Sequence, residues 1–172
     1  MSKKNLTQDR LKYLLSYDSE TGVFVWVRTT SNRVSVGSRA GRDNGNGYRR
    51  INIDGCPYYE HVLAWLYTHG EYPRVEIDHK DGDGYNNCIS NLREATHLEN
   101  GQNQSLRSTN TTGAHGVSFS KLHKKYEAYI WFKGKKRHLG LFKSKKLAKT
   151  AYLEAKENIH LFQPVPRDVE HV

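Results

Sequence analysis

The 172-residue chain has few cysteines and no long apolar run. Its two cysteines, Cys56 and Cys88, each lack a second cysteine two or four residues away, which excludes a zinc ribbon and a disulfide framework. No stretch approaches the roughly 18 apolar residues of a membrane span. The N-terminus MSKKNLTQDRLKYLL has no continuous apolar segment that would indicate a signal peptide. The sequence therefore predicts a soluble, intracellular protein with reduced thiols and no membrane partner.

The hydrophobic content predicts two small modules rather than one. Hydrophobic residues make up 36% of the chain, which is low for a single large core. The segment GQNQSLRSTNTTG loses all hydrophobic pattern, so we expect a linker at residues 105–113. It would separate a module at 1–104 from one at 114–163, followed by a tail at 164–172.

Positive charge is concentrated in one short segment. Residues 1–112 carry 14 Lys/Arg and 13 Asp/Glu, whereas residues 113–163 carry 12 and 3. Such a segment predicts a polyanionic partner, because each Lys or Arg placed on a phosphate releases condensed counterions. The alternative for a charge run alone is a role in solubility.

Periodicity predicts the elements of both modules. In the first, we expect a helix that Thr7 caps, that carries Leu11, Leu14 and Leu15 and that ends near the turn signal SYDSETG. Strands are expected at 23–27 and 48–53, with Asp54-Gly55 as a hairpin turn, and a helix at 60–69 that Gly70 ends. A β-β-α unit is expected at about 74–104.

In the second module, strands are predicted near 116–120, 126–133 and 136–142, followed by a helix at 145–158 capped by Ser144. The helix residues expected to pack on the sheet recur every four positions: Leu147, Ala151, Ala155 and Ile159.

Segment 78–100 has the residue types needed to hydrolyse a DNA phosphodiester. That reaction needs an activated water, an electrophile at the phosphate oxygens and neutralisation of the leaving oxygen, and one divalent metal can serve the last two needs. Histidine suits the base, since its unperturbed pKa of about 6.5 leaves it mostly neutral. Asp and Asn oxygens suit a hard cation such as Mg²⁺.

Three blocks of sequence resemble the HNH endonucleases, specifically the branch found in phage and intron homing endonucleases. They are EHVLAW at 60–65, VEIDHKDGDGYNNCISNLREAT at 75–96 and LEN at 98–100. Their order, Asp-His, Asn-Asn, Asn-Leu-Arg and Glu-Asn, is long and spaced, which makes the resemblance specific.

The resemblance implies a role for four residues. His79 would be the general base and Asp78 a ligand of one divalent cation. Asn91 would be the central Asn that pins the loop by hydrogen bonds, and Asn100 the second ligand, offered by the helix. Because Asn stands at a position that is His in other branches, Mg²⁺ is favoured, with Mn²⁺ as the alternative.

Adjacent residues on a regular strand point to opposite faces, so Asp78 and His79 can share a site only if the strand ends or kinks there. The DGDG sequence at 81–84 favours such a turn. We interpret Asp81 and Asp83 as turn residues rather than metal ligands. A calcium loop is excluded because no bidentate Glu follows at the required distance.

The segment from Gly116 to Ile159 is similar to the DNA-binding domain of plant ethylene-response factors, which also occurs appended to phage HNH nucleases. The markers are Gly-Val at 116–117, Ala-x-Ile at 128–130 and Leu-Gly-x-Phe at 139–142. This resemblance implies a three-stranded sheet laid in the major groove, with a helix behind it.

Alternation divides the strand residues into two rows. The row expected in the core is Val117, Phe119, Ala128, Ile130, Phe132 and Leu139. The row expected to contact DNA is Ser118, Ser120, Tyr129, Trp131, Lys136 and His138. Because the plant pattern has Arg at several of these positions, base preference does not transfer. The exposed aromatics leave single-stranded bases as an alternative ligand.

Two further cations are candidate DNA contacts. Arg50 lies in the outward row of its strand, and Arg93 could steady a phosphate or form a salt bridge. His61, which could pack beneath the site, and His97 are interpreted as structural.

The sequence thus predicts an α+β protein, with a ββα-metal nuclease domain followed by a three-stranded antiparallel sheet packed on one helix. Its predicted function is metal-dependent, site-preferring cleavage of double-stranded DNA by a monomer without an obligatory protein partner. The alternative is a sequence-specific DNA-binding regulator with an inactive nuclease-like scaffold.

Overall fold

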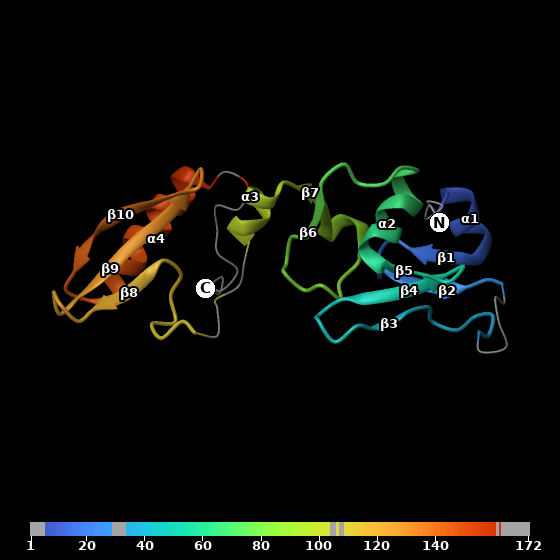
Figure 1. The fold of residues 1–172 in the computed structure, drawn as a ribbon, viewed down its shortest axis with the longest axis horizontal. Helices are drawn as coiled ribbons and strands as arrows, with labels where there is room; N and C mark the ends of the chain where they lie inside the picture. The colour runs from blue at the N-terminus through green and yellow to red at the C-terminus, as the bar shows by residue number, and fades with distance from the viewer. Residues whose placement is uncertain (1–5, 29–33, 104–105, 107–108, 161, 163–172) are drawn as a thin grey trace. The chain divides into compact units, whose positions relative to one another are not determined.

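The computed structural model describes residues 6–28, 34–103, 106, 109–160 and 162. Two compact units, Met1–Ala95 and Thr96–Val172, make up the chain (Figure 1). The division falls after Ala95 rather than at the predicted linker, part of which lies outside the described residues. The predicted tail at 164–172 lies outside them as well.

The described residues of the first unit form three small antiparallel sheets and two α-helices. Its sheets pair β1 with β2, β3 with β4 and β5, and β6 with β7. The elements are α1 (Gln8–Leu14), β1 (Leu15–Asp18), β2 (Val23–Trp26), β3 (Arg42–Asp43), β4 (Arg49–Ile53), β5 (Cys56–Tyr59), α2 (Glu60–His69), β6 (Glu76–His79), the 3₁₀ turn η1 (Ile89–Asn91) and β7 (Leu92–Ala95).

Local capping and turn signals explain most of these boundaries. The Thr7 hydroxyl accepts a hydrogen bond from the Arg10 backbone N–H at the start of α1. Gly70 ends α2 in the left-handed conformation, with φ of 81°. Strand β1 is the exception, because the sequence predicted a turn there and Leu15 on the helix. Leu15 instead begins a strand paired with β2.

One core holds the first unit together. Its buried side chains come from α1, β1, β2, β4, α2 and β7, and include Leu11, Leu15, Phe24, Ile51, Leu63 and Leu92. Leu92 is the cross-strand partner of His79. The core therefore anchors the short β6–β7 ladder that carries the predicted catalytic residues.

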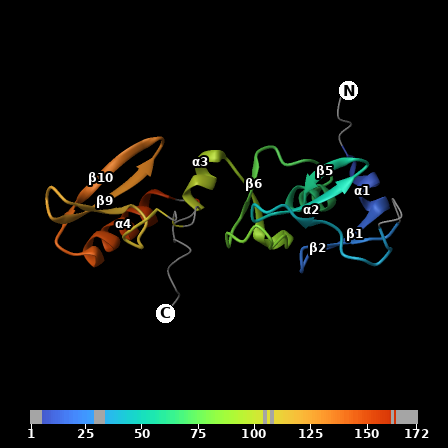
Figure 2. The same ribbon diagram turned by 60° about the horizontal axis from the view of Figure 1, so that its bottom comes forward.

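The second unit is a three-stranded antiparallel sheet with a helix on one face, as predicted. Its elements are α3 (His97–Asn100), the 3₁₀ turn η2 (Gly101–Asn103), β8 (Val117–Ser120), β9 (Lys125–Phe132), β10 (Lys135–Phe142) and α4 (Lys145–Ile159), and the sheet order is β10-β9-β8. Both views show α4 running along this sheet (Figures 1 and 2). The Ser144 hydroxyl caps α4 by accepting from the Leu147 N–H.

Two packing predictions for this unit are wrong. Phe119 was assigned to the core but is 50% exposed, because it lies outside the cluster of Ala114, Val117, Ala128 and Ala148, with its ring against that of Tyr126. The buried face of α4 centres on Ala148, Tyr152 and Lys156, whereas Leu147 is 54% exposed. The helix is thus rotated by about one residue, or 100°, from the predicted orientation.

The thiols and the helix lengths agree with the sequence analysis. Cys56 and Cys88 are free and partly buried. Within the described part of the chain, even the longest helix, α4, has only 15 residues, and none could cross a bilayer.

Candidate active site

Strand β6 ends at His79, where the chain was expected to turn. The Gly82 N–H donates to the His79 carbonyl at 2.9 Å, which closes the turn. Asp78 is paired with Arg93 across the ladder and His79 with Leu92. Since successive strand residues alternate in direction, the two side chains have different neighbours.

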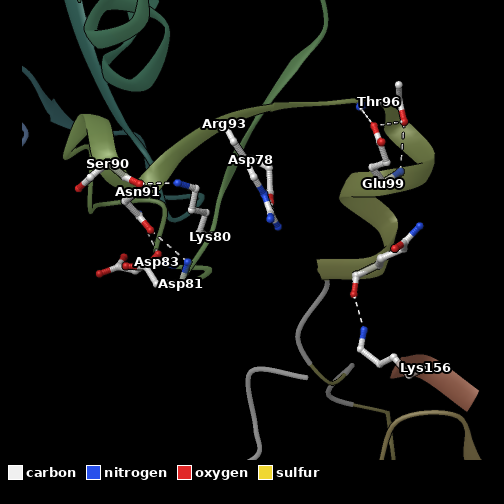
Figure 3. A network of polar contacts seen from close by, with 11 residues as sticks. Asp78, Lys80, Asp81, Asp83, Ser90, Asn91, Arg93, Thr96, Glu99 and Lys156 are labelled. Atoms are coloured by element: carbon white, nitrogen blue, oxygen red, sulfur yellow. Dashed lines mark hydrogen bonds and ion pairs between the residues drawn. The ribbon is translucent and has the colours of Figure 1, made fainter. Parts of the chain in front are cut away.

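Asn91 joins the two ends of the loop that connects β6 to β7. Its amide oxygen accepts from the Asp81 N–H at 3.1 Å, and its amide nitrogen donates to the Asp81 carboxylate at 2.9 Å (Figure 3). The same amide nitrogen donates to the Asn86 carbonyl at 2.8 Å. Lys80 adds a bond from Nζ to the Ser90 carbonyl at 2.6 Å. These contacts fix the loop against the end of η1.

Asp81 and Asp83 act as turn residues, as predicted. Asp81 accepts from the Asp83 N–H at 2.9 Å, and Asp83 accepts from the Tyr85 N–H at 2.9 Å. Burial disfavours the ionised form of Asp81, but its hydrogen bonds outweigh burial and lower the pKa.

His79 is buried and held by an asparagine. Its Nε2 lies 3.1 Å from Oδ1 of Asn87, and Asn87 is itself fully buried. The Asn87 carbonyl accepts from the Tyr17 hydroxyl at 2.7 Å, which fixes its backbone from β1. This contact was not predicted from the sequence.

The rings of His61 and Tyr48 lie beside the His79 imidazole. His61 stands edge-on to it with ring centroids 5.2 Å apart, and Tyr48 lies at 5.8 Å. Tyr59 stacks on His61 at 5.2 Å. Burial, with a smaller effect of the His79 charge, lowers the pKa of His61 to about 3, so its ring is neutral at physiological pH.

A buried carboxylate that sequence analysis missed lies behind Asn87. Glu60, the first residue of α2, is 1% exposed and accepts from Nδ2 of Asn87 at 3.2 Å. Its other oxygen, Oε1, accepts a hydrogen bond from Nε of Arg49 at 3.0 Å. Glutamate is common in the first turn of any helix, so its only special signal was its place in the EHVLAW block.

Asp78 forms an ion pair with Arg93. Nε and Nη2 of Arg93 both lie 2.8 Å from Oδ2 of Asp78, which is 3% exposed (Figure 3). Of the two roles predicted for Arg93, a phosphate contact or a salt bridge, the salt bridge is therefore present, and it is largely buried. The carboxylate is a donor of the kind that hard cations prefer. In the described part of the chain, no three His, Cys, Asp or Glu side chains cluster as a metal site.

The remaining predicted site residue of the nuclease motif, Asn100, lies in the second unit. It is the last residue of α3, which begins with a capping box between Thr96 and Glu99 (Figure 3). The turn after α3 is tied to α4, because Lys156 donates to the Gln102 carbonyl at 2.8 Å. The convergence of Asn100 with Asp78 on one ion stays a prediction.

The predicted DNA-contacting row lies on the face of the second sheet opposite the core row. None of its six members is buried: Ser118, Ser120, Tyr129, Trp131, Lys136 and His138. Nζ of Lys136 lies 3.9 Å from the Tyr129 ring centroid, and His138 lies 3.3 Å from the Glu127 carboxylate. In the first unit, the Arg50 guanidinium lies 4.2 Å from the Tyr59 ring centroid and bonds its hydroxyl.

Comparison with known proteins finds a family match in the middle of the chain. Residues 58–102 match the HNH endonuclease family. This HNH segment contains α2, the β6–β7 ladder and α3, and the sheet of the second unit lies outside it.

Two individual proteins are also similar. Protein 3.8 of Escherichia phage T7 is 33% identical over 79 residues, 45% of this chain. The match spans 65% of that relative, less than two thirds of its length. A solved structure that concerns DNA binding and cleavage by the HNH homing endonuclease I-HmuI matches with a TM-score of 0.43 and 21% identity. That match covers 78% of this chain and 75% of the other.

Proposed function

We propose that the chain is a metal-dependent, site-preferring DNA endonuclease in which His79 is the general base. The HNH segment contains every residue assigned to the reaction, which supports this function. The observation that carries the proposal is the fixed, buried imidazole of His79, held through Nε2 at 3.1 Å by Asn87. A base needs such a defined direction relative to the water that it deprotonates.

The residues around His79 suit that role. A bond from Nε2 to Asn87 leaves the lone pair on Nδ1, which can take the proton of a water. The neutral ring of His61 adds no charge that would repel the imidazolium formed in this step. Asn91 keeps the loop, and with it Asn87, in place.

A divalent cation, Mg²⁺ or alternatively Mn²⁺, would stabilise the charge on the phosphate and on the leaving oxygen. Asp78 is the first proposed ligand, and Arg93 orients its carboxylate. Asn100 is assigned as the second ligand on the sequence resemblance alone. Both offer oxygen, which fits a hard cation better than a soft one.

The outward face of the β8–β10 sheet is proposed to bind double-stranded DNA. The exposed aromatics, hydroxyls and cations of this face can contact phosphates and base edges. The segment around it carries most of the excess positive charge of the chain. The ethylene-response-factor-like resemblance, the DNA contacts of Arg50 and Arg93, and action as a monomer belong to the same proposal.

Incubation with supercoiled plasmid and Mg²⁺, with and without a chelator, tests the function. We expect metal-dependent nicking that His79→Ala abolishes while DNA affinity is retained. His69→Ala, an exposed histidine on α2, is the matched control and should cleave normally. Cleavage by His79→Ala near the wild-type rate would exclude His79 as the base. Tight binding without nicking under any condition would favour the DNA-binding regulator instead.

A further inference from the structure

A chain of two hydrogen bonds joins the buried carboxylate of Glu60 to His79. Oε2 of Glu60 lies 3.2 Å from Nδ2 of Asn87, and Oδ1 of Asn87 lies 3.1 Å from Nε2 of His79. All three side chains are buried, so water does not compete strongly for these bonds. The three residues come from α2, the loop after β6, and β6 itself.

The carboxylate determines which way each group in this chain is oriented. An ionised Glu60 can only accept, so the Asn87 atom that faces it must be the NH₂ group. The amide oxygen of Asn87 therefore faces His79 and can only accept in turn. Consequently the proton of a neutral His79 lies on Nε2, and the lone pair lies on Nδ1.

Glu60 is itself held in place. Arg49 pairs with its Oε1 at 3.0 Å and donates to the Gly41 carbonyl at 2.8 Å. Burial raises the pKa of Glu60, and the charge of Arg49 opposes that rise. A Cβ on Gly41 would overlap Oε1 of Glu60, so the approach depends on glycine at that position.

We propose that Glu60 is a positioning residue that sets the tautomer of His79 through Asn87. The catalytic consequence rests on the proposed function of His79 as the base, whereas the tautomer itself does not. Other histidine bases bind their orienting carboxylate directly, whereas here the Asn87 amide stands between the carboxylate of Glu60 and His79. Its effect on His79 is indirect, through the Asn87 amide.

Replacing Glu60 by Gln should reverse the whole chain of bonds. Arg49 requires an oxygen from residue 60, so the introduced amide turns its NH₂ toward Asn87. Asn87 must then offer it the oxygen and turn its own NH₂ toward His79. Nε2 of His79 becomes the acceptor, and the proton moves to Nδ1.

Nitrogen-15 NMR of the His79 ring in the full chain, at a pH where the ring is neutral, measures the tautomer without any DNA. We expect the Nε2–H form in the wild type and the Nδ1–H form in Glu60→Gln. In the plasmid assay we expect kcat to fall roughly 10- to 1,000-fold with KM for DNA unchanged. Glu71→Gln, which alters an exposed carboxylate beside Arg74, is the matched control and should change neither reading.

The two readings separate failure of this inference from failure of the proposed function. A wild type with the Nδ1–H form overturns the inference without any variant. A Glu60→Gln protein that keeps both the Nε2–H tautomer and the wild-type kcat overturns the inference as well. If the tautomer reverses but the wild type never cleaves DNA, Glu60 still positions His79 and the nuclease proposal fails. A reversed tautomer with unchanged kcat would overturn the catalytic consequence.

Discussion

Removing the partner of a buried carboxylate is expected to destabilise the first unit strongly. Arg49→Met deletes the guanidinium that pairs with Glu60 and keeps most of the aliphatic length. Breaking a buried pair on one side typically costs about 3–5 kcal/mol, because the remaining charge has lost its compensation. The Asn87 amide still bonds Glu60, so we expect the lower end, about 3 kcal/mol at neutral pH.

The loss should also depend on pH in a defined direction. Burial already raises the pKa of Glu60, and loss of Arg49 raises it further. Below that raised pKa, Glu60 binds a proton in the folded variant and the buried charge disappears. The difference between wild type and Arg49→Met should therefore shrink as the pH falls.

Urea denaturation followed by tryptophan fluorescence measures this effect. A Trp131→Phe background leaves Trp26 and Trp65, both in the first unit, as reporters. Arg74→Met is the control, since its partner Glu71 is exposed and such pairs contribute at most about 1 kcal/mol. Combining Arg49→Met with Glu60→Leu should recover much of the stability. A loss for Arg49→Met no larger than that of the control would refute the argument.

Two further predictions concern pH and salt. Because the pKa of His61 is lowered to about 3, the folded state binds fewer protons than the unfolded state between that value and about 6.5. The free energy of unfolding should therefore fall as the pH is lowered through this window, by up to about 1.4 kcal/mol per pH unit. His61→Phe should make the free energy of unfolding depend less steeply on pH in urea titrations from pH 7 to 5. Lys136→Ala should reduce the slope of log affinity for duplex DNA against log salt by about 1 in anisotropy titrations, and an unchanged slope would show that Lys136 contacts no phosphate.

The elements that the sequence predicted well are those set by contacts within a few residues. The hydroxyls of Thr7 and Ser144 bond the N–H groups of their own helices. Asp54 and Gly55 turn the chain with positive φ values of 50° and 80°. Such signals act locally, so the sequence alone is enough to find them.

Burial in the second unit was harder to predict, because it depends on where the helix crosses the sheet. Leu147 and Phe119 both fit an apolar period, yet both lie at the margin of the covered area. Periodicity specifies a face only to within about one residue. The crossing itself is set by tertiary packing around Ala148 and Tyr152.

The contacts that orient His79 could not be predicted for a different reason. Glu60 and Asn87 each have an adequate local explanation, as a first-turn acid and a loop residue. Their contact joins positions 27 residues apart. Only the fold brings them together, so neither residue type nor spacing distinguishes them from ordinary neighbours.

The two strands of the β6–β7 ladder have four residues each, and among the residues that the structure describes they have no third partner in their sheet. An isolated pair of that length is marginal in water, and Leu92 joins this one to a core cluster, most of whose buried side chains come from residues 6–53. A fragment excised at 58–102 would therefore lose its shape. Transplanting this chemistry into another protein requires moving residues 6–57 with it.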